Sequence, residues 1–235
     1  MKRIVLIICL ISYVGGTAQN DCIASEILNK KQLKETEDAV KLFWKWDTID
    51  EPERAVRMLS DINKRDPSNW IAPFWASYIT TQLSNQREEI KESLEELNKA
   101  QEFLDEANKI YSKGSLPCFK PYFHALQTLI YTLKRYAYEG LKEQEKVKHF
   151  AELQLSELNK GIKLDINNPV LMVLAGTGLA SRSNNDLSSI IAAISLLEKA
   201  KKEFEQIQNR SPADIGYMNE HWVAPWLKRL APPSN

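Results

Sequence analysis

A proline followed by large apolar residues recurs along the chain and sets the pattern of the rest. The four phrases begin at Pro73, Pro121, Pro169 and Pro225, and each has large apolar residues one, two and five positions later. The first three prolines are 48 residues apart, and the fourth follows after 56. Because the backbone amides of a first helical turn have no helical partner, proline is tolerated there. We therefore interpret each phrase as the start of a helix.

Apolar residues three or four positions apart predict about nine helices in all. The predicted ranges are 23–47, 52–65, 70–83, 86–112, 119–139, 142–164, 169–181, 187–208 and 220–230. Turns rich in Asn, Asp, Pro or Gly separate them. No segment keeps the two-residue alternation of a half-buried strand, so the sequence predicts an all-α protein.

Two of these helices are apolar around much of their circumference. The helix predicted over 70–83 has two adjacent apolar stripes, and the one over 169–181 is almost wholly apolar. A helix with so wide an apolar arc has to be covered on more than one side. Gly176 and Gly178 are expected to let a neighbouring backbone approach the second of these helices closely.

A second spacing recurs in three predicted helices: a small residue, a large one four positions later and another packing residue three after that. It is present as Ala55, Leu59 and Ile62, as Ala100, Leu104 and Ala107, and as Ala200, Phe204 and Ile207. Pro67 and Pro212 follow the first and third sets after five residues. This spacing resembles the second helix of the tetratricopeptide repeat.

The resemblance, which covers most of residues 35–230, is to a degenerate, exported bacterial protein of the tetratricopeptide-repeat type. It implies stacked antiparallel helical hairpins that form a single domain over residues 19–235. The physical reason is independent of the family, because one hairpin cannot bury both of its apolar faces and a stack can.

The N-terminus has the pattern of a secretory signal peptide. Lys2 and Arg3 precede an apolar run over 4–14, and small residues at Gly16 and Ala18 occupy the positions that a signal peptidase reads. The run is shorter than the roughly 20 residues needed to cross a bilayer. We predict that residues 1–18 are removed and that the protein is exported to the periplasm, with an extracellular or envelope-associated location as the alternative.

The net charge and the cysteine content limit the kinds of binding partner and of cross-link that we expect. The formal net charge is zero, and it is −2 without residues 1–18, so nothing indicates electrostatic capture of nucleic acid or of a membrane. We expect no stable membrane insertion after signal cleavage. Cys22 and Cys118 would remain, and an oxidising compartment permits a disulfide between them. Two unpaired thiols are the alternative.

No pattern of residues indicates catalysis or a bound metal. His124, His149 and His221 lie on separate predicted helices and lack the His–Glu–x–x–His spacing of a zinc site. The sequence also lacks the Gly–x–Ser–x–Gly and Ser–x–x–Lys signatures of acyl-transfer enzymes. We therefore expect a non-enzymatic protein with no catalytic residue, metal or cofactor.

Aromatic clusters over 70–78, 119–124 and 217–226 are the feature that stands out. Most of these side chains are expected to form the core between helices. The remainder are expected at a binding surface, because the first helices of such hairpins line the concave face of the stack. The candidate binding residues are Trp70, Tyr78, Tyr122, His124 and Trp222.

Two functions fit these clusters. The first is an interaction scaffold for a protein or peptide, which predicts a broad groove of mixed charge. The second is a carbohydrate or small-ligand binding protein, which predicts a closed pocket with two or more aromatic rings and convergent polar groups. An enzyme would instead need a buried pair of carboxylates or histidines.

Overall fold

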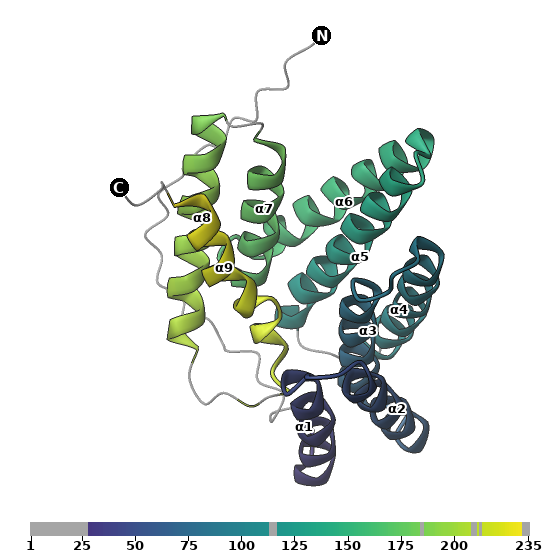
Figure 1. Cartoon of the computed structure of the whole chain (residues 1–235). Helices are drawn as coiled ribbons and strands as arrows, with labels where there is room; N and C mark the ends of the chain where they lie inside the picture. The colour runs from purple at the N-terminus through teal and green to yellow at the C-terminus, as the bar shows by residue number, and fades with distance from the viewer. Residues whose placement is uncertain (1–27, 113–116, 184–185, 208–210, 212, 232–235) are drawn as a thin grey trace.

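The chain folds entirely as helices over the part that a computed structural model describes, residues 28–112, 117–183, 186–207, 211 and 213–231 (Figure 1). The helices are α1 (Lys30–Trp44), α2 (Asp50–Arg65), α3 (Ile71–Ser84), α4 (Ile90–Tyr111), α5 (Lys120–Gly140), α6 (Gln144–Leu164), α7 (Pro169–Arg182), α8 (Leu187–Gln206) and α9 (Glu220–Leu230). Short 3₁₀ turns, Pro117–Phe119 and Ile215–Tyr217, precede α5 and α9. Within these described ranges the predicted all-α fold and its nine helices are confirmed.

Side-chain caps fix several of the helix starts. The Asn29 side chain accepts hydrogen bonds from the amides of Lys31 and Gln32, and the Gln32 side chain accepts one from the Asn29 amide. Asn168 caps α7 in the same way, and Asp186 caps α8. Each cap satisfies amides that have no partner inside their own helix, which is why these polar residues mark the boundaries.

The recurrent prolines do not all mark helix starts. Pro73, Pro121 and Pro169 lie in the first turns of α3, α5 and α7, as predicted. Pro225 lies inside α9, so the prediction that it begins a helix is wrong. The chain enters α9 earlier because Asn219, with a left-handed φ of 68°, redirects the backbone there. Pro225 has no amide hydrogen to donate to the carbonyl one turn earlier, that of His221.

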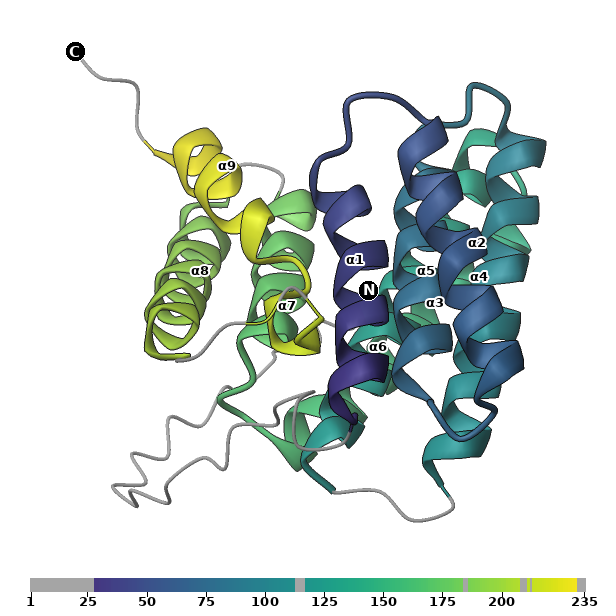
Figure 2. The ribbon, with the colours of Figure 1, turned by 90° about the horizontal axis from the view of Figure 1, so that it is seen from below.

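Successive helices pair and the pairs stack. The helix pairs α1–α2, α3–α4, α5–α6 and α7–α8 pack against each other, and neighbouring pairs meet through α2–α3, α4–α5 and α6–α7. Figure 2 shows the first three pairs side by side, with α9 lying on α7 and α8. The predicted stack of antiparallel helical hairpins is therefore present.

The third helix is the centre of the core. Every residue of α3 is buried, and the helix contacts α1, α2, α4 and α5. The rings of Trp70, Phe74 and Phe123 pack against one another with centroids 5.1–6.2 Å apart. The expectation that this helix is covered on more than one side is confirmed.

A crossing segment, residues 213–219, covers the remaining face of α3 after leaving α8. The Trp75 indole Nε1 donates a hydrogen bond of 2.7 Å to the carbonyl of Ala213. The Tyr78 hydroxyl donates to the Asn219 side-chain oxygen at 3.2 Å and accepts from the Asn219 amide at 3.3 Å. These contacts join residues more than 130 positions apart and hold the C-terminal part of the chain against its first half.

The seventh helix is buried only in its first half. Residues 169–174 and Gly176 are buried, whereas the rest of α7 is partly accessible, so the expectation of a wholly buried helix is wrong for its C-terminal half. A Cβ on Gly176 would lie 3.1 Å from the Leu197 side chain and 3.2 Å from the Ala193 carbonyl. The predicted close approach is thus confirmed at Gly176. At Gly178 the nearest atom belongs to Arg182 of the same helix, so the same prediction is wrong there.

Two predictions concern residues outside the described ranges. Residues 1–18, the predicted signal peptide, are among them, and so is Cys22. Cys118 is disulfide-bonded, and the other two cysteines of the sequence both lie outside the described residues. The pairing of Cys118 with Cys22 stays a prediction.

Candidate ligand-binding site

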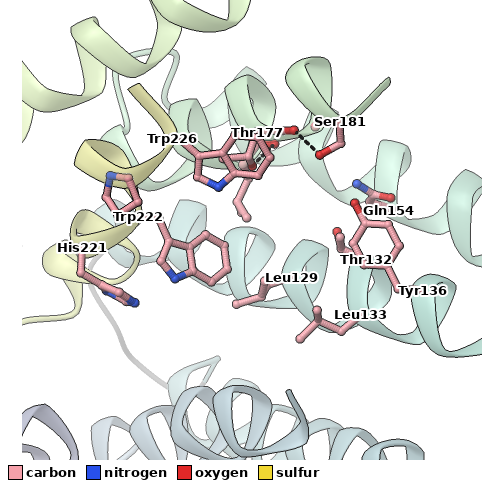
Figure 3. Close-up of a pocket in the computed structure, with 13 residues that line it drawn as sticks. Leu129, Thr132, Leu133, Tyr136, Gln154, Thr177, Ser181, His221, Trp222 and Trp226 are labelled. Atoms are coloured by element: carbon pink, nitrogen blue, oxygen red, sulfur yellow. Dashed lines mark hydrogen bonds between the residues drawn. The ribbon is translucent and has the colours of Figure 1, made fainter. Parts of the chain in front are cut away.

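A cavity of about 350 Å³ lies between α5, α7 and α9, with one contribution from α6 (Figure 3). We call it the α5–α7–α9 cavity. Its lining is mainly apolar and aromatic, with a small number of polar side chains. The residues are Leu129, Thr132, Leu133, Tyr136, Gln154, Leu174, Thr177, Gly178, Ser181, His221, Trp222, Pro225 and Trp226.

Helical periodicity explains which side chains reach the cavity. The lining positions of α5 run from Leu129 to Tyr136 at intervals of three and four residues, and those of α7 run from Leu174 to Ser181 in the same way. Residues at this spacing share one face of a helix. The C-terminal half of α7 is therefore accessible because it faces the cavity, with Gly178 leaving space where a side chain would stand.

One end of the cavity is aromatic. Trp222 and Trp226 project from α9 and are both half-buried. The His221 ring contacts the rings of Trp44 and Trp222 edge-on, with centroids 5.6 and 5.9 Å away. Figure 3 shows the two indoles and the imidazole toward the same end. This end offers ring faces and edges to a ligand.

The other end of the cavity is more polar. Gln154 is only 4% exposed, and its side-chain oxygen has no hydrogen-bond partner among the described residues. Figure 3 shows Gln154 beside Tyr136, Thr132 and Ser181, away from the indoles. A buried polar atom without a partner costs free energy, so this amide is a ready hydrogen-bonding group for a bound molecule.

His221 keeps part of its surface exposed, but its packing against two indole rings partly removes the imidazole from water and lowers its pKa below the ordinary value of 6.5. The imidazole is therefore mainly neutral at pH 7. We expect a pKa below 6.5 for His221 when its ring signals are followed by NMR through a pH titration. The sign follows from linkage: as pH falls through 6.5 the unfolded chain takes up a proton first, and stability decreases. The stability loss below pH 6.5 should be smaller in His221→Gln. A His221 pKa of 6.5 or higher would contradict the packing of its ring against the indoles of Trp44 and Trp222.

Three of the five predicted binding residues belong to the interior. Trp70 is 4% exposed, Tyr78 is fully buried and Tyr122 is also buried, so the prediction that they lie at a binding surface is wrong. The physical reason is the position of α3 at the centre of the stack, together with the crossing segment that covers Tyr78. Trp222 alone among the five lines the α5–α7–α9 cavity.

His124, the remaining predicted residue, forms a hydrogen bond to a carboxylate and does not line the cavity. Its Nδ1 lies 2.7 Å from Glu157 Oε2, and Lys160 Nζ lies 2.6 Å from the other carboxylate oxygen. Burial opposes ionisation of Glu157, but the hydrogen bonds from Lys160 and His124 outweigh it and lower the pKa of that carboxyl. The histidine and carboxylate are 33 positions apart, so no local spacing could have shown the pair. This contact links α5 to α6.

A second, shallower depression of about 560 Å³ lies between α1 and α2. Acidic and basic side chains both line it, among them Glu35, Asp61, Lys64 and Arg65. They pair with one another, since Arg65 contacts Glu35 at 2.9 Å and Lys64 contacts Asp61 at 3.4 Å. This depression has the mixed charge expected of a scaffold's groove, with its charges already matched.

No group of three or more His, Cys, Asp or Glu side chains is placed to hold a metal ion in the described part of the chain. Within the same residues, no helix combines the length and apolarity that a bilayer crossing needs.

Comparison with known proteins supports the fold. No family model matches the chain, and no curated protein matches its sequence. Among solved structures, the chain is similar to the HusA haemophore from Porphyromonas gingivalis, with a TM-score of 0.67 and 15% sequence identity. The similarity covers 86% of this chain and 95% of the haemophore. It therefore concerns the helical fold over nearly the full length of both chains.

Proposed function

We propose that this protein binds a flat, largely apolar small molecule in the α5–α7–α9 cavity. The observation that carries the proposal is a single cavity lined by the rings of Trp222 and Trp226 at one end and of Tyr136 at the other. Gln154, whose buried side-chain oxygen has no partner among the described residues, lines the same cavity. Ring faces favour a planar apolar ligand, and one or two placed polar groups fix its orientation. The volume of about 350 Å³ lies in the range of small-molecule sites.

A tetrapyrrole is the first ligand class to test. The chain shares its fold with a haemophore, and a porphyrin is flat, apolar over most of its surface and edged with polar groups. The neutral His221 imidazole at the aromatic end has the chemistry of an iron ligand. Haemin and metal-free protoporphyrin IX therefore make a useful pair of probes, because binding of both would assign recognition to the ring rather than to the iron.

Binding rather than catalysis, in an exported protein, fits the other observations. The cavity brings together aromatic, aliphatic and hydroxyl side chains with one amide and one imidazole. The disulfide at Cys118 fits an oxidising compartment, as the signal-peptide pattern of residues 1–18 does. We propose the periplasm or the extracellular space as the site of action.

An interaction scaffold is the second candidate, and the depression between α1 and α2 favours it. Its charges are matched within the protein, which leaves little electrostatic reason to recruit a partner. The face of α3 that a peptide-binding stack would offer is covered by the crossing segment. Ligand binding in the cavity is therefore the better-supported function.

A pair of substitutions at one position tests the proposal. Gly178→Leu should weaken protoporphyrin IX binding at least about tenfold, because the new side chain extends into space that the ligand needs. Gly178→Ala is the matched control, since its Cβ meets only the Arg182 guanidinium at 3.4 Å. Both changes should keep or slightly raise stability, by up to about 1 kcal/mol, because glycine is a poor residue inside a helix. Quenching of tryptophan fluorescence gives the affinities.

Two results would count against the proposed function. One is the absence of saturable binding of either porphyrin to the wild-type protein at micromolar concentrations. The other is equal affinity of the Gly178→Leu and Gly178→Ala proteins, both folded by circular dichroism, which would place any bound porphyrin elsewhere on the molecule.

A further inference from the structure

Two arginines, Arg135 and Arg182, lie next to lining residues at the polar end of the cavity, and neither has a carboxylate partner among the described residues. The Arg182 Nε donates a hydrogen bond of 3.0 Å to the carbonyl of Gly178, and a terminal nitrogen of the same guanidinium lies 3.4 Å from where a Cβ on Gly178 would be. Since Gly178 lines the cavity, the positive charge of Arg182 lies directly behind that part of the wall.

Arg135 reaches the same end from α5. Its guanidinium carbon lies 4.6 Å from the centre of the Tyr136 ring, and Tyr136 lines the cavity. Partial burial lowers the pKa of Arg182, and the positive charge of Arg135 lowers it further. Arginine side chains in proteins carry a positive charge at physiological pH.

These two charges are not neutralised within the described residues. No salt bridge joins Arg135 or Arg182 to an acidic side chain there, whereas several other arginines are paired, Arg65 with Glu35 and Arg87 with Glu96 among them. Two cations at one end of a cavity without an anionic partner favour the binding of an anion there.

We propose that the α5–α7–α9 cavity takes a flat apolar ligand that carries a carboxylate, with the ring against Trp222 and Trp226 and the carboxylate against Arg135 and Arg182. The inference rests on the proposed function and adds the orientation and chemical class of the ligand. Guanidinium groups match carboxylates in shape and can donate two hydrogen bonds at once. Gln154 lies at the same end, buried and without a partner for its side-chain oxygen, which can accept a hydrogen bond only from a donor group of the ligand.

Protoporphyrin IX has two carboxylates, and its dimethyl ester has none. Comparing the two separates the contribution of the carboxylates to binding from that of the apolar ring. Wild-type protein should bind the diacid about tenfold or more tightly than the diester, since a hydrogen bond to a charged group contributes on this scale. The double variant Arg135→Gln/Arg182→Gln should lose that preference by weakening diacid binding, with diester binding almost unchanged. The affinity for the diacid alone should fall as salt is raised.

A matched control tests whether the loss of positive charge alone changes the preference for the diacid, and a second variant replaces the double variant if that protein is unstable. Arg54→Gln/Arg57→Gln removes the same charge from exposed positions on α2, a helix that contributes nothing to the cavity lining, and should leave the preference for the diacid intact. If the double variant is unstable, Arg182→Glu alone, at an exposed position, should reverse the preference.

The possible failures are distinguishable. Binding of both porphyrins that Gly178→Leu blocks, but with no preference for the diacid or with a preference that survives Arg135→Gln/Arg182→Gln, would overturn this inference and leave the proposed function standing. Failure of both porphyrins to bind wild-type protein would overturn the two together.

Discussion

Replacing Trp75 with alanine should lower the free energy of unfolding by about 3–5 kcal/mol, the range for truncation of a buried aromatic side chain. Trp75 is fully buried, and its ring meets those of Trp44 and Tyr78 edge-on, with centroids 6.2 and 5.5 Å away. Its indole also donates the hydrogen bond that anchors Ala213, so truncation would leave a cavity and a buried carbonyl without its partner.

Urea unfolding followed by circular dichroism measures this loss, provided that wild-type and variant proteins unfold in a single transition. Trp44→Ala is the matched control, because Trp44 packs on Trp75 but is 39% exposed. We expect about 1 kcal/mol or less for that change. A loss below about 1 kcal/mol for Trp75→Ala would mean that the crossing segment is not held against α3 as the structure has it.

The helices were predictable from the sequence because each is encoded locally. Apolar spacing placed α7, α8 and α9 within two residues of their observed ends, and the capping residues Asn168 and Asp186 stand at two of those boundaries. Local periodicity also predicted that α3 is covered on several sides. Local periodicity could not show which segment covers α3, because the crossing segment that covers Trp75 and Tyr78 comes more than 130 residues later.

The same limit explains the outcome for the candidate site. Trp70 and Tyr78 are aromatic residues on a helix that a repeat of this kind would turn toward a groove, and only the return of the C-terminal chain buries Tyr78. The cavity is lined by α5, α7 and α9. All three carry the recurrent proline phrase, but that spacing does not indicate which faces of the helices meet. Trp222 was predicted because it belongs to an aromatic cluster. Tyr136 and Gln154 belong to no aromatic cluster, and nothing in the sequence around them indicates a binding residue.

The crossing segment links the fold to the proposed function. Asn219, held by Tyr78, is the residue at which the chain turns into α9, and α9 begins at the next position. The two indoles of the cavity are therefore placed by contacts made on the opposite side of the crossing segment, in α3. The face of α3 that a helical stack would otherwise leave open is covered by the C-terminal part of the same chain. The accessible aromatic side chains are instead those of the cavity beside α7.

Replacing both Trp222 and Trp226 with alanine should weaken porphyrin binding about 100-fold. Stacking of an aromatic side chain on a flat ring contributes about 1–3 kcal/mol, and two such contacts together reach that factor. The loss should affect protoporphyrin IX and its dimethyl ester equally, because the indoles contact the ring rather than the carboxylates. This equal loss distinguishes the aromatic end from the arginine end, where only the diacid should respond.

Trp46→Ala is the control, because Trp46 is also a half-buried tryptophan but packs on Phe43 and does not line the cavity. It should leave the affinity within about twofold of the wild-type value, which corresponds to a change below roughly 0.5 kcal/mol. Absorbance of the bound porphyrin gives the affinities, since changing the tryptophans alters the fluorescence signal itself. If a folded Trp222→Ala/Trp226→Ala protein bound porphyrin as tightly as Trp46→Ala, the aromatic end of the cavity would have no part in recognition.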